Sequence, residues 1–573
     1  MISGADYLLE TLAELGVEVI FGYPGGAVLP LYDALIRQDR IRHILVRHEQ
    51  AAVHAAQGYA RSSGKLGVVL VTSGPGATNT LTGLADALMD SVPVLCIAGQ
   101  VNRALIGSDG FQEANIVAMS RAATKYNVSL RDPAMLDGVL RRAFAIAIAG
   151  RPGPVLVEIP KDVQGFCGSP AAFRSRSFAV TTTSSAPARP GDFVAAAALI
   201  LGARRPVIYT GGGVINSGTR ATALLRALAE RTGAPVTSTL MGLGAYPATG
   251  SQWLGMPGMH GTYEANLAMH GCDVMVCIGA RFDDRVTGRL DGFAPDARKI
   301  HIDIDASQIG KIVPVDVGLV GDCGDMLAAL LAVLGTGDPL DAWWQTIFGW
   351  RDRECLGYTP DDRVILPQHA IARVHALTAH LSPIITTEVG QHQMWAAQYI
   401  GFDRPARWLT SGGLGTMGYG LPAAIGAQVA HPEALVIDIA GEASIQMNIQ
   451  ELATAIQFGL PVKVFIVNNE RMGMVRQWQD RHHEGRRAHS YASALPDFVA
   501  LAAAYGWTGL RVSDPAKLDA TISQMICTRG PVLVDCRVAA DENCLPMMPT
   551  GAAHNEIELA APAKTDLAWC RGS

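Results

Sequence analysis

The chain has 573 residues, of which 49% are hydrophobic and 17% are charged, and its formal net charge is -6. This length exceeds what one hydrophobic core usually supports, so three or four domains are expected. The composition is that of a globular protein and excludes a disordered or fibrous one. The acidic balance, without a basic block interleaved with aromatic residues, argues against a nucleic-acid-binding surface.

The ten cysteines are scattered without a Cys-x-x-Cys pair, so neither a zinc site nor a disulfide framework is indicated. Reduced thiols in a cytosol are the simpler interpretation. Residues 1–10 enter an amphipathic helix that contains acids, which is not typical of a signal peptide. The longest apolar run, around 193–203, is shorter than the roughly 20 residues that span a bilayer. A cytoplasmic protein that binds neither membrane nor nucleic acid is therefore expected.

Residues 1–165 alternate apolar strands with helical segments, as in a parallel sheet with crossover helices. The predicted strands are 17–21, 43–47, 66–71, 94–98 and 154–159. Two of them run into glycine-rich turns, at 22–26 and 72–79, where backbone can approach a ligand closely. Either turn, taken alone, is also compatible with a plain turn. Glu49 lies between a strand and a helix predicted at 50–61, where an acid also suits a helix start.

A linker rich in Ser, Thr and Pro at 168–190 precedes a second α/β domain, which is expected at 191–340. In it a strand at 206–210 runs into three consecutive glycines, at 211–213. This is not a G-x-G-x-x-G motif, and alone it is a weak signal for a dinucleotide. A second connection, 336–365, contains Trp343, Trp344 and Trp350, which are expected to anchor it on a domain.

A third domain is expected at 366–540, followed by a tail at 541–573. One apolar strand of this domain ends in Gly441-Glu442-Ala443, a helix follows, and the next apolar strand ends in Asn468-Asn469. In an open parallel sheet both strand ends face one crevice, so Glu442 and Asn469 can converge on one ion. Carboxylate and amide oxygens suit Mg²⁺, which usually keeps phosphate oxygens as well. The stretch therefore predicts a seat for a diphosphate and Mg²⁺.

The same stretch resembles the thiamine-diphosphate enzymes, which carry Gly-Asp-Gly followed by Asn-Asn in these places. The continuations 446–452 and 474–478 resemble more narrowly the acetolactate synthases, also called acetohydroxyacid synthases. Glu442 and Ala443 depart from the family's Asp and second Gly. The longer carboxylate can still bind a metal from one methylene further back. Ala443 would be strained if its φ had to be positive.

The resemblance implies three doubly wound parallel-sheet domains. The first would bind the pyrimidine, the central one would be associated with FAD, and the third would bind the diphosphate. Glu49, within Arg47-His48-Glu49-Gln50, resembles the glutamate that binds N1′ of the aminopyrimidine. A carboxyl there favours the imino tautomer, whose 4′-nitrogen can remove the C2 proton of the thiazolium. Glu49 and Glu442 belong to different domains, which in the family come from two chains. At least a homodimer is therefore implied, and a homotetramer is left open.

The activity implied by the resemblance is decarboxylation of pyruvate and transfer of its two-carbon unit to a second 2-keto acid. The product is 2-acetolactate or, from 2-ketobutyrate, 2-aceto-2-hydroxybutyrate, in branched-chain amino acid biosynthesis. The implied cofactors are thiamine diphosphate, Mg²⁺ and an FAD that takes no net redox part. The implied catalytic positions are Glu49, Gln112, Lys161, Arg285 and Trp478, and the implied metal positions are Glu442, Asn469 and Arg471.

The positions implied to bind thiamine diphosphate are Gly26, Pro75, Asn79, Val389, Gln391, His392, Gln393, Gly415, Met417, Gly441, Ala443, Ser444, Met472, Gly473 and Met474. Those implied to bind FAD are Arg151, Gly211, Gly212, Gly213, Thr239, Leu240, Leu254, Gly255, Met256, Gly279, Arg281, Asp283, Val286, Asp303, Ile304, Asp322 and Cys323. Met417 is implied to wedge between the two cofactor rings, and Trp478 to favour 2-ketobutyrate. Segments 482–490 and 545–553 are expected to cover the site. A core methionine and a structural aromatic are the alternative interpretations of Met417 and Trp478.

Two other functional hypotheses remain open. A pyruvate oxidase or a glyoxylate carboligase uses the same cofactor, but an oxidase reduces its flavin during turnover, and such a carboligase lacks the glutamate seen here as Glu49. A non-catalytic nucleotide-binding or assembly protein is conceivable because of Glu442 and Ala443. The sequence does not establish whether a small regulatory subunit binds.

Overall fold

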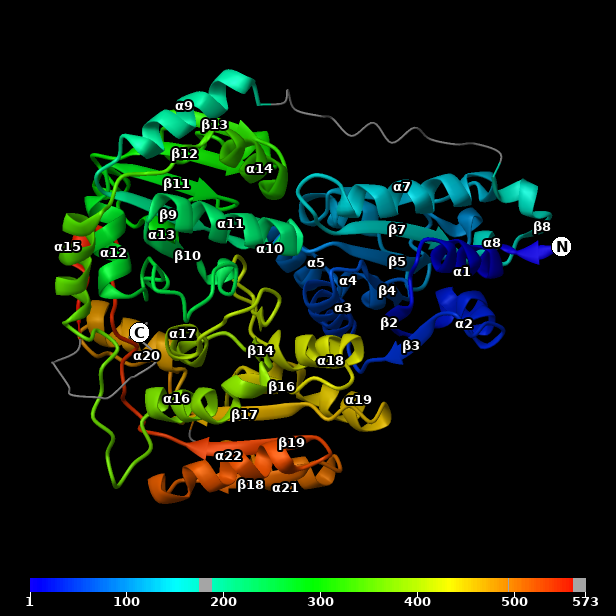
Figure 1. Cartoon of the computed structure of the whole chain (residues 1–573). Coiled ribbons are helices and arrows are strands. Elements are labelled where there is room, and N and C mark those ends of the chain that lie inside the picture. Colours follow the sequence, from blue (N-terminus) through cyan, green and yellow to red (C-terminus); the bar gives the residue numbers. More distant parts are fainter. Residues whose placement is uncertain (175–187, 493, 560–573) are drawn as a thin grey trace.

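The computed structural model describes residues 1–174, 188–492 and 494–559 of the 573-residue chain. Three separate parallel β-sheets lie within these ranges, each flanked by helices (Figure 1). This confirms the predicted class of three α/β domains with parallel sheets. Most of the linker predicted at 168–190, and residues 560–573 of the predicted tail, lie outside the described residues.

The N-terminal sheet has six parallel strands in the order β3-β2-β4-β5-β7-β6. The five predicted strands are confirmed to within a few residues. The sixth strand, β6, was not predicted because its four residues are all half-buried and show no alternation. The strands are β2 (Val19–Tyr23), β3 (Arg42–Leu45), β4 (Gly67–Val71), β5 (Val94–Gln100), β6 (Tyr126–Ser129) and β7 (Val155–Pro160), and the longer helices are α1 (Gly4–Glu14), α2 (Leu29–Ile36), α3 (Glu49–Ser63), α5 (Leu81–Met89) and α7 (Leu136–Ile148).

The central sheet has five parallel strands in the order β10-β9-β11-β12-β13. Its strands β9 and β11 are buried along their whole length, as expected for a sheet covered on both faces. The strands are β9 (Pro206–Thr210), β10 (Val236–Ser238), β11 (Val274–Ile278), β12 (Arg298–Asp303) and β13 (Val317–Val320), and the longer helices are α9 (Pro190–Leu201), α11 (Gly218–Thr232), α12 (Tyr263–Gly271) and α14 (Cys323–Val333).

The C-terminal sheet has six parallel strands in the order β15-β14-β16-β17-β19-β18. Strands β16 and β17 are neighbours, with Gly441 opposite Val467, so their carboxyl ends share one edge of the sheet as predicted. The strands are β14 (Ile384–Thr387), β15 (Trp408–Leu409), β16 (Val436–Gly441), β17 (Lys463–Asn468), β18 (Thr508–Val512) and β19 (Val532–Arg537), and the longer helices are α16 (Pro367–Thr378), α17 (Gln391–Tyr399), α18 (Gly420–Ala430), α20 (Gly473–His482), α21 (Phe498–Ala504) and α22 (Leu518–Cys527).

The segment between β16 and β17 is not the single helix predicted there. It consists of a 3-10 helix, η10 (Ile445–Glu451), followed by a short α19 (Leu452–Gln457). The backbone of Asn448 is non-helical, with φ -134°, and its Nδ2 donates to the carbonyl of Gly418 at 2.7 Å. This side chain thus bonds to backbone outside its own helix, which explains the break.

The connection between the central and C-terminal domains contains a helix, α15 (Asp341–Arg351), which carries the three predicted tryptophans. The indole nitrogen of Trp343 donates to the carbonyl of Pro206 at 3.1 Å, and that of Trp344 to the carbonyl of Gly233 at 2.9 Å. The rings of Trp343 and Trp350 pack edge to face at 5.5 Å. The tryptophans therefore anchor the connection on the central domain, as predicted.

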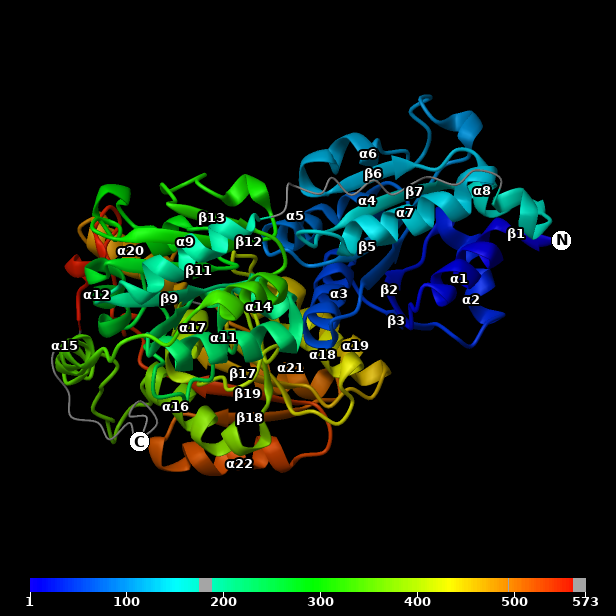
Figure 2. The same cartoon turned by 45° about the horizontal axis from the view of Figure 1, so that its top comes forward.

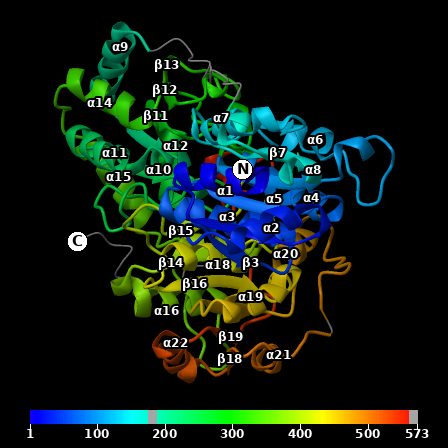
Figure 3. The ribbon, with the colours of Figure 1, turned by 90° about the vertical axis from the view of Figure 1, so that its right-hand side faces the viewer.

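The N-terminal and C-terminal domains meet where helix α3 packs on helix α18 (Figures 1 and 2). Two glycines make this contact close. A Cβ added at Gly58 would lie 2.1 Å from the carbonyl oxygen of Ala423, and one at Gly426 would lie 1.8 Å from that of Ala55. Apolar residues of both domains form one continuous core here. Seen from the N-terminal domain, the central domain lies above and the C-terminal domain below (Figure 3). Among the described residues, no helix is long and apolar enough to cross a membrane.

We expect Gly426→Ala to lower the melting temperature strongly, because its methyl group would meet backbone that cannot rotate away. Overpacking of this kind costs about 1–3 kcal/mol or more. The matched control is Gly349→Ala in helix α15, where an added Cβ meets no atom within 4 Å. Scanning calorimetry should show an unchanged or higher melting temperature for the control. Equal melting temperatures for Gly426→Ala and wild type would contradict the close contact.

Candidate functional site

One group of predicted residues gathers at the carboxyl edge of the N-terminal sheet. Glu49 is the first residue of α3, and the N-cap residue His48 accepts the Gln50 N–H through Nδ1. Asn79 donates from Nδ2 to Glu49 Oε2 at 2.9 Å. This bond fixes one carboxylate oxygen of Glu49. The other oxygen, Oε1, faces the turn at Gly76, where an added Cβ would lie 3.4 Å away.

The two glycine-rich turns meet at Thr72. A Cβ added at Gly25 or Gly76 would lie 2.5 or 2.6 Å from the Thr72 side chain, so both positions need glycine. Thr72 Oγ1 also accepts the N–H of Ala27 at 3.2 Å. This contact brings the segments that contain the predicted residues Gly26 and Pro75 together beside Glu49.

The predicted substrate-side residues Gln112 and Lys161 also belong to the N-terminal domain. Gln112 packs against Gly74 and has a φ of +59°, an unusual value for a residue with a side chain. Lys161 is half-buried and begins the short helix α8 (Lys161–Gln164) directly after β7.

The second group gathers at the carboxyl ends of β16 and β17. Glu442 is 1% exposed, and its Oε1 has no hydrogen-bond partner among the described residues. Burial raises the pKa of this carboxyl to about 7, although backbone N–H groups of Asn469 and Arg471 partly offset the effect. A buried carboxylate with an oxygen that lacks a hydrogen-bond partner is costly, and the more distant Arg537 offsets its charge only in part. The site therefore suits a cation that would neutralise Glu442.

Asn469 lies beside Glu442 and is oriented by two contacts. Its Oδ1 accepts the N–H of Arg471 at 3.1 Å, and its Nδ2 donates to Gln391 Oε1 at 3.4 Å. The guanidinium of Arg471 lies over the Tyr491 ring, 4.4 Å from its centre, so only the carbonyl of Arg471 is suited to a metal. In the described part of the chain, no three His, Cys, Asp or Glu side chains form a metal cluster. A metal here would thus depend on Glu442, an amide oxygen, backbone and ligand oxygens.

The backbone around Glu442 is closely packed. A Cβ at Gly441 would lie 2.7 Å from the His392 ring, and one at Gly473 would lie 1.9 Å from Gln391 Oε1. Among the residues that the structure describes, none bonds to the buried His392 Nε2, and burial lowers the pKa of this ring to about 3. Ala443 is not among the residues with positive φ, so the strain considered for this position is absent.

A cavity of ≈ 610 Å³ lies between the central and C-terminal domains and also reaches the N-terminal domain. It brings together most of the residues predicted around FAD with part of the predicted cofactor and substrate set. The predicted residues that line it are Arg151, Gly212, Gly213, Thr239, Leu240, Met256, Gly279, Arg281, Asp283, Arg285, Val286, Asp303, Ile304, Asp322, Cys323, Val389, Gln393, Gly415, Met474 and Trp478.

Other predicted residues lie outside this cavity. Gly211 is packed behind its wall, because an added Cβ would lie 2.4 Å from the carbonyl oxygen of Gly279. Leu254 and Gly255 line a second cavity, of ≈ 330 Å³, while Met256 borders both cavities. Glu49 does not line the large cavity, and its hydrogen bond with Asn79 stays within the N-terminal domain.

Several residues that line the large cavity were not predicted. Met259 is the methionine of a second Gly-Met pair, three residues after Gly255-Met256, and the sequence does not tell the two pairs apart. Asp90, at the end of α5, gives no sequence signal for a site, because an acid at a helix end resembles a surface residue. The lining residues missed in this way include Met89, Asp90, Met241, Met259, His260, Gly412 and Gly413.

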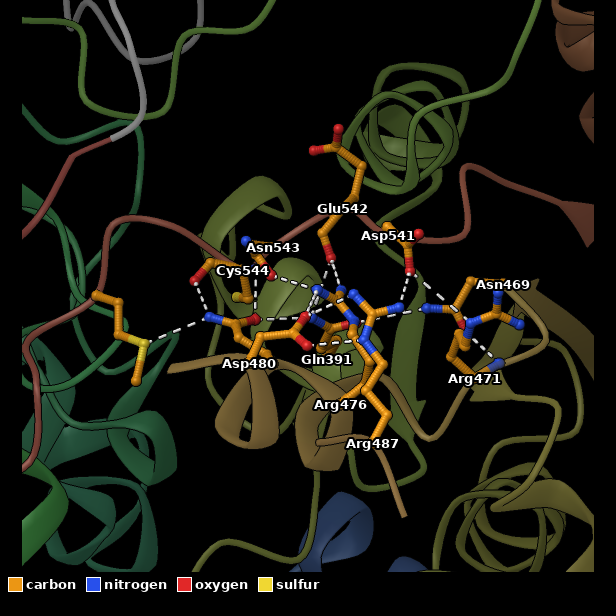
Figure 4. Close-up of polar contacts among 12 residues, drawn as sticks. Gln391, Asn469, Arg471, Arg476, Asp480, Arg487, Asp541, Glu542, Asn543 and Cys544 are labelled. Atoms are coloured by element: carbon orange, nitrogen blue, oxygen red, sulfur yellow. Dashed lines mark hydrogen bonds and ion pairs between the residues drawn. The ribbon is translucent and has the colours of Figure 1, made fainter. Parts of the chain in front are cut away.

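A polar network joins the loop of Asn469 to the segment after β19 (Figure 4). Gln391 Nε2 donates to Gln477 Oε1 at 2.7 Å, and Gln477 in turn accepts the N–H of Cys544 at 2.9 Å. Arg476, which is 1% exposed, donates to Asn543 Oδ1 at 2.6 Å and to the carbonyl of Glu542. Residues 541–544 are thus fixed beside the predicted metal loop.

Two acids of the central domain, Asp303 and Asp322, line the large cavity. Burial raises the pKa of Asp303, at the end of β12, to about 6, and the neighbouring Asp305 carboxylate contributes to the rise. Asp322 caps α14 by accepting the N–H of Gly324 at 2.8 Å. An acid after a strand of a parallel sheet suits the hydroxyls of a ribose.

Comparison with known proteins gives three family models that match in chain order. They are the N-terminal TPP binding domain of thiamine pyrophosphate enzymes at residues 2–119, the central domain at 194–330 and the C-terminal TPP binding domain at 388–536. The chain is 46% identical to the acetolactate synthase isozyme 3 large subunit of Escherichia coli, over 99% of this chain and 100% of that one. It is 45% identical to the acetolactate synthase large subunit of Haemophilus influenzae, over 98% and 99%. It is 47% identical to the acetolactate synthase of Mycobacterium leprae, over 98% and 91%.

We expect Arg476→Met to loosen residues 541–544, because Asn543 Oδ1 loses its buried donor and the Glu542 carbonyl keeps only the bond from Gln391 Nε2, at 3.2 Å. A group left unpaired in this way costs about 1–3 kcal/mol. Hydrogen exchange of peptides covering 541–547 measures the effect and should be faster than in wild type. The control Arg486→Met removes an exposed arginine that pairs with Glu484. Unchanged exchange in Arg476→Met would show that the network does not hold this segment.

Proposed function

Because the chain belongs to the thiamine pyrophosphate enzymes, and among them to the acetolactate synthases, we propose that it joins two 2-keto acids. Pyruvate loses CO₂, and its two-carbon unit is transferred to a second pyruvate or to 2-ketobutyrate. The products are 2-acetolactate and 2-aceto-2-hydroxybutyrate, precursors in branched-chain amino acid biosynthesis. The observation that carries this proposal is 46% identity to an acetolactate synthase over 99% of the chain.

The residues present fit thiamine pyrophosphate and Mg²⁺. When bound, thiamine pyrophosphate supplies the carbon nucleophile and the electron sink for decarboxylation. Glu442 and Asn469 would hold Mg²⁺ together with pyrophosphate oxygens, and the supporting observation is the unpartnered buried Oε1 of Glu442. Gln391 and His392 lie against the same backbone and would face the pyrophosphate.

Glu49 would hold a proton at the aminopyrimidine nitrogen. Asn79 donates to Oε2 and thereby orients the carboxyl, which leaves Oε1 for the ligand. A carboxyl that bonds to one ring nitrogen sets the protonation state of the ring. Glu49 would in this way act as a general acid–base group, although it lies at a distance from the reacting carbon. Met417, half-buried between Thr416 and Gly418, would shape the bound cofactor.

The second keto acid would enter through the large cavity. Arg285 and Trp478 both line it, and a guanidinium binds a carboxylate with two hydrogen bonds. The apolar ring of Trp478 would contact the extra methyl group of 2-ketobutyrate. Gln112 and Lys161 would approach the second keto acid from the N-terminal domain.

FAD fits the part of the cavity between the central and C-terminal domains. The wall there combines apolar side chains with Arg151 and Arg281, which suit phosphates, and with Asp303 and Asp322, which suit ribose hydroxyls. In this proposal FAD has a structural role and is not reduced during turnover.

The complete site would lie between two chains. Glu49 belongs to the N-terminal domain and does not line the cavity that contains Gly415 and Met474. We therefore propose at least a homodimer, in which Glu49 of one chain serves the Glu442 cradle of the other. Two of the relatives are named large subunits, so a small partner subunit is also proposed for this chain.

The deciding experiment is an anaerobic pyruvate reaction with thiamine pyrophosphate, Mg²⁺ and FAD. Acetoin after acidification, with flavin absorbance unchanged during turnover, supports the proposal. Stoichiometric flavin bleaching would instead indicate a pyruvate oxidase. Absence of any product with all cofactors saturating would favour a non-catalytic nucleotide-binding or assembly protein.

We expect Glu49→Gln to slow exchange of the C2 proton of bound cofactor by about 10²- to 10⁴-fold, because a neutral amide cannot hold the ring proton. Proton exchange followed by NMR after acid quench measures this step directly. The control Glu18→Gln removes an exposed carboxylate that pairs with Lys65 and should change nothing. An unchanged exchange rate in Glu49→Gln would refute the role of Glu49.

We expect Glu442→Ala to abolish Mg²⁺-dependent binding of thiamine pyrophosphate, because the methyl group offers the ion no oxygen. Glu442→Asp should retain binding and activity, since it restores the residue common in the family. Titration calorimetry with and without Mg²⁺ distinguishes the two variants. Wild-type affinity in Glu442→Ala would show that the metal lies elsewhere.

A further inference from the structure

The loop between β15 and α18, residues 411–417, contains two residues proposed above to face the cofactor, Gly415 and Met417. Its tip is open, with Leu414 45% exposed and Gly415 at φ +72°. The loop is closed on itself by one bond, from the Thr416 N–H to Ser411 Oγ at 2.8 Å. Such a loop needs further contacts to keep one shape.

Those contacts come from two sides. Within the C-terminal domain, Gln393 Nε2 donates to the Ser411 carbonyl at 3.0 Å. The other contacts come from the N-terminal domain of the same chain. Asp90 follows helix α5, and its two carboxylate oxygens accept the N–H groups of Gly412 at 2.9 Å and Gly413 at 2.7 Å. Each oxygen of Asp90 therefore binds a different backbone donor. An asparagine at this position would turn its NH₂ group toward one of these donors and lose that bond.

Asp86, one turn earlier on α5, holds the loop from its other side. Its Oδ1 accepts from the hydroxyl of Ser411 and, at 3.1 Å, from that of Thr416. Arg61 of helix α3 donates to the carbonyl of Thr410 at 2.5 Å and to the Tyr419 hydroxyl at 3.1 Å. The loop is thus bound at both ends by charged residues, of which Asp86 is buried and Arg61 and Asp90 are half-buried.

These acids do not serve mainly to join the two domains. The glycine contacts between α3 and α18 already hold the domains together, at Gly58 and Gly426. The hydrogen bonds of Asp90 to the C-terminal domain reach only Gly412 and Gly413 among the described residues. Their effect is therefore local to the loop.

Charged and titratable groups from several parts of the chain surround Asp90. Burial raises the pKa of Asp90 to about 6, the Asp86 carboxylate contributes to the rise, and Arg61 and the two glycine N–H groups oppose it. Burial also raises the pKa of Asp86. Arg151 and Tyr419 interact with Asp90 electrostatically, and Arg281 lies beside Gly413. The usual pKa of an aspartate is near 4, so Asp90 changes charge within the range in which the enzyme can be studied.

We propose that Asp86 and Asp90 are positioning residues, which hold loop 411–417 in the shape that presents Gly415 and Met417 to thiamine pyrophosphate. This inference rests on the proposed function. It gives the N-terminal domain two roles in a dimer. Glu49 would complete the partner's site, while Asp86 and Asp90 shape the site of their own chain, so each N-terminal domain would contribute to both sites.

The test compares wild type with Asp90→Asn in thiamine pyrophosphate binding at saturating Mg²⁺, by titration calorimetry between pH 5.5 and 8. The variant should bind about 10-fold more weakly at pH 8, where wild-type Asp90 is a carboxylate with two acceptor oxygens. The ratio of the two dissociation constants should fall as the pH is lowered toward 5.5, because protonated Asp90 also loses one acceptor. Titrating groups distant from Asp90 affect both proteins and cancel in this ratio, whereas Asp86 interacts with Asp90 and titrates together with it. A purely structural defect would leave the ratio independent of pH.

The control Asp33→Asn removes an acid with a side chain that is 71% exposed and should bind as wild type does. Thr416→Val keeps both acids and removes one donor to Asp86, so it should weaken cofactor binding by a smaller factor. If circular dichroism shows that Asp90→Asn is unfolded, the affinity of Thr416→Val decides whether the acids position the loop. Wild-type affinity in the folded variant at pH 8, or a pH-independent ratio, overturns the inference. A wild type that neither binds the cofactor nor forms acetolactate would instead overturn the proposed function.

Discussion

Helix α3 begins at Glu49 and packs backbone to backbone on helix α18 of the same chain. Gly58 and Gly426 allow this contact, and a side chain at either position would meet a carbonyl within about 2 Å. The N-terminal sheet and the C-terminal sheet are therefore fixed relative to one another. This fixed contact determines which functional groups one chain can bring together and which it leaves to a second chain.

The two halves of the candidate site have complementary chemistry. The N-terminal half presents a carboxyl oriented by Asn79, while the C-terminal half buries Glu442, whose Oε1 has no hydrogen-bond partner among the described residues. A buried, unpaired carboxylate is unfavourable in the protein alone, so the C-terminal half gains most from binding a cation with an anionic ligand. In the proposed function, one half of the chain would bind the pyrophosphate end of the cofactor, and the other half would bind an aminopyrimidine ring.

Much of the fold follows from the sequence because buried parallel strands are short apolar runs that end in glycine or polar residues. This pattern located the strands of the N-terminal sheet and the adjacent ends of β16 and β17. It missed β6, which is half-buried, and it predicted one helix where Asn448 breaks the segment. Most other candidate site residues came from the family resemblance, while Glu442 and Asn469 were also proposed because each follows a strand. Asp86 and Asp90 were not, because their partners lie more than 300 residues away and only the folded chain brings them together.

The most direct test of the account mixes two variants, Glu49→Gln and Glu442→Ala, each of which should be inactive alone. If the site lies between chains, a mixed dimer has one site with both defects and one intact site. With random pairing, half of the dimers are mixed, so about one quarter of wild-type acetolactate formation should return. If each chain instead built its own site, every site would carry one defect. The mixture would then stay inactive, which would contradict the account.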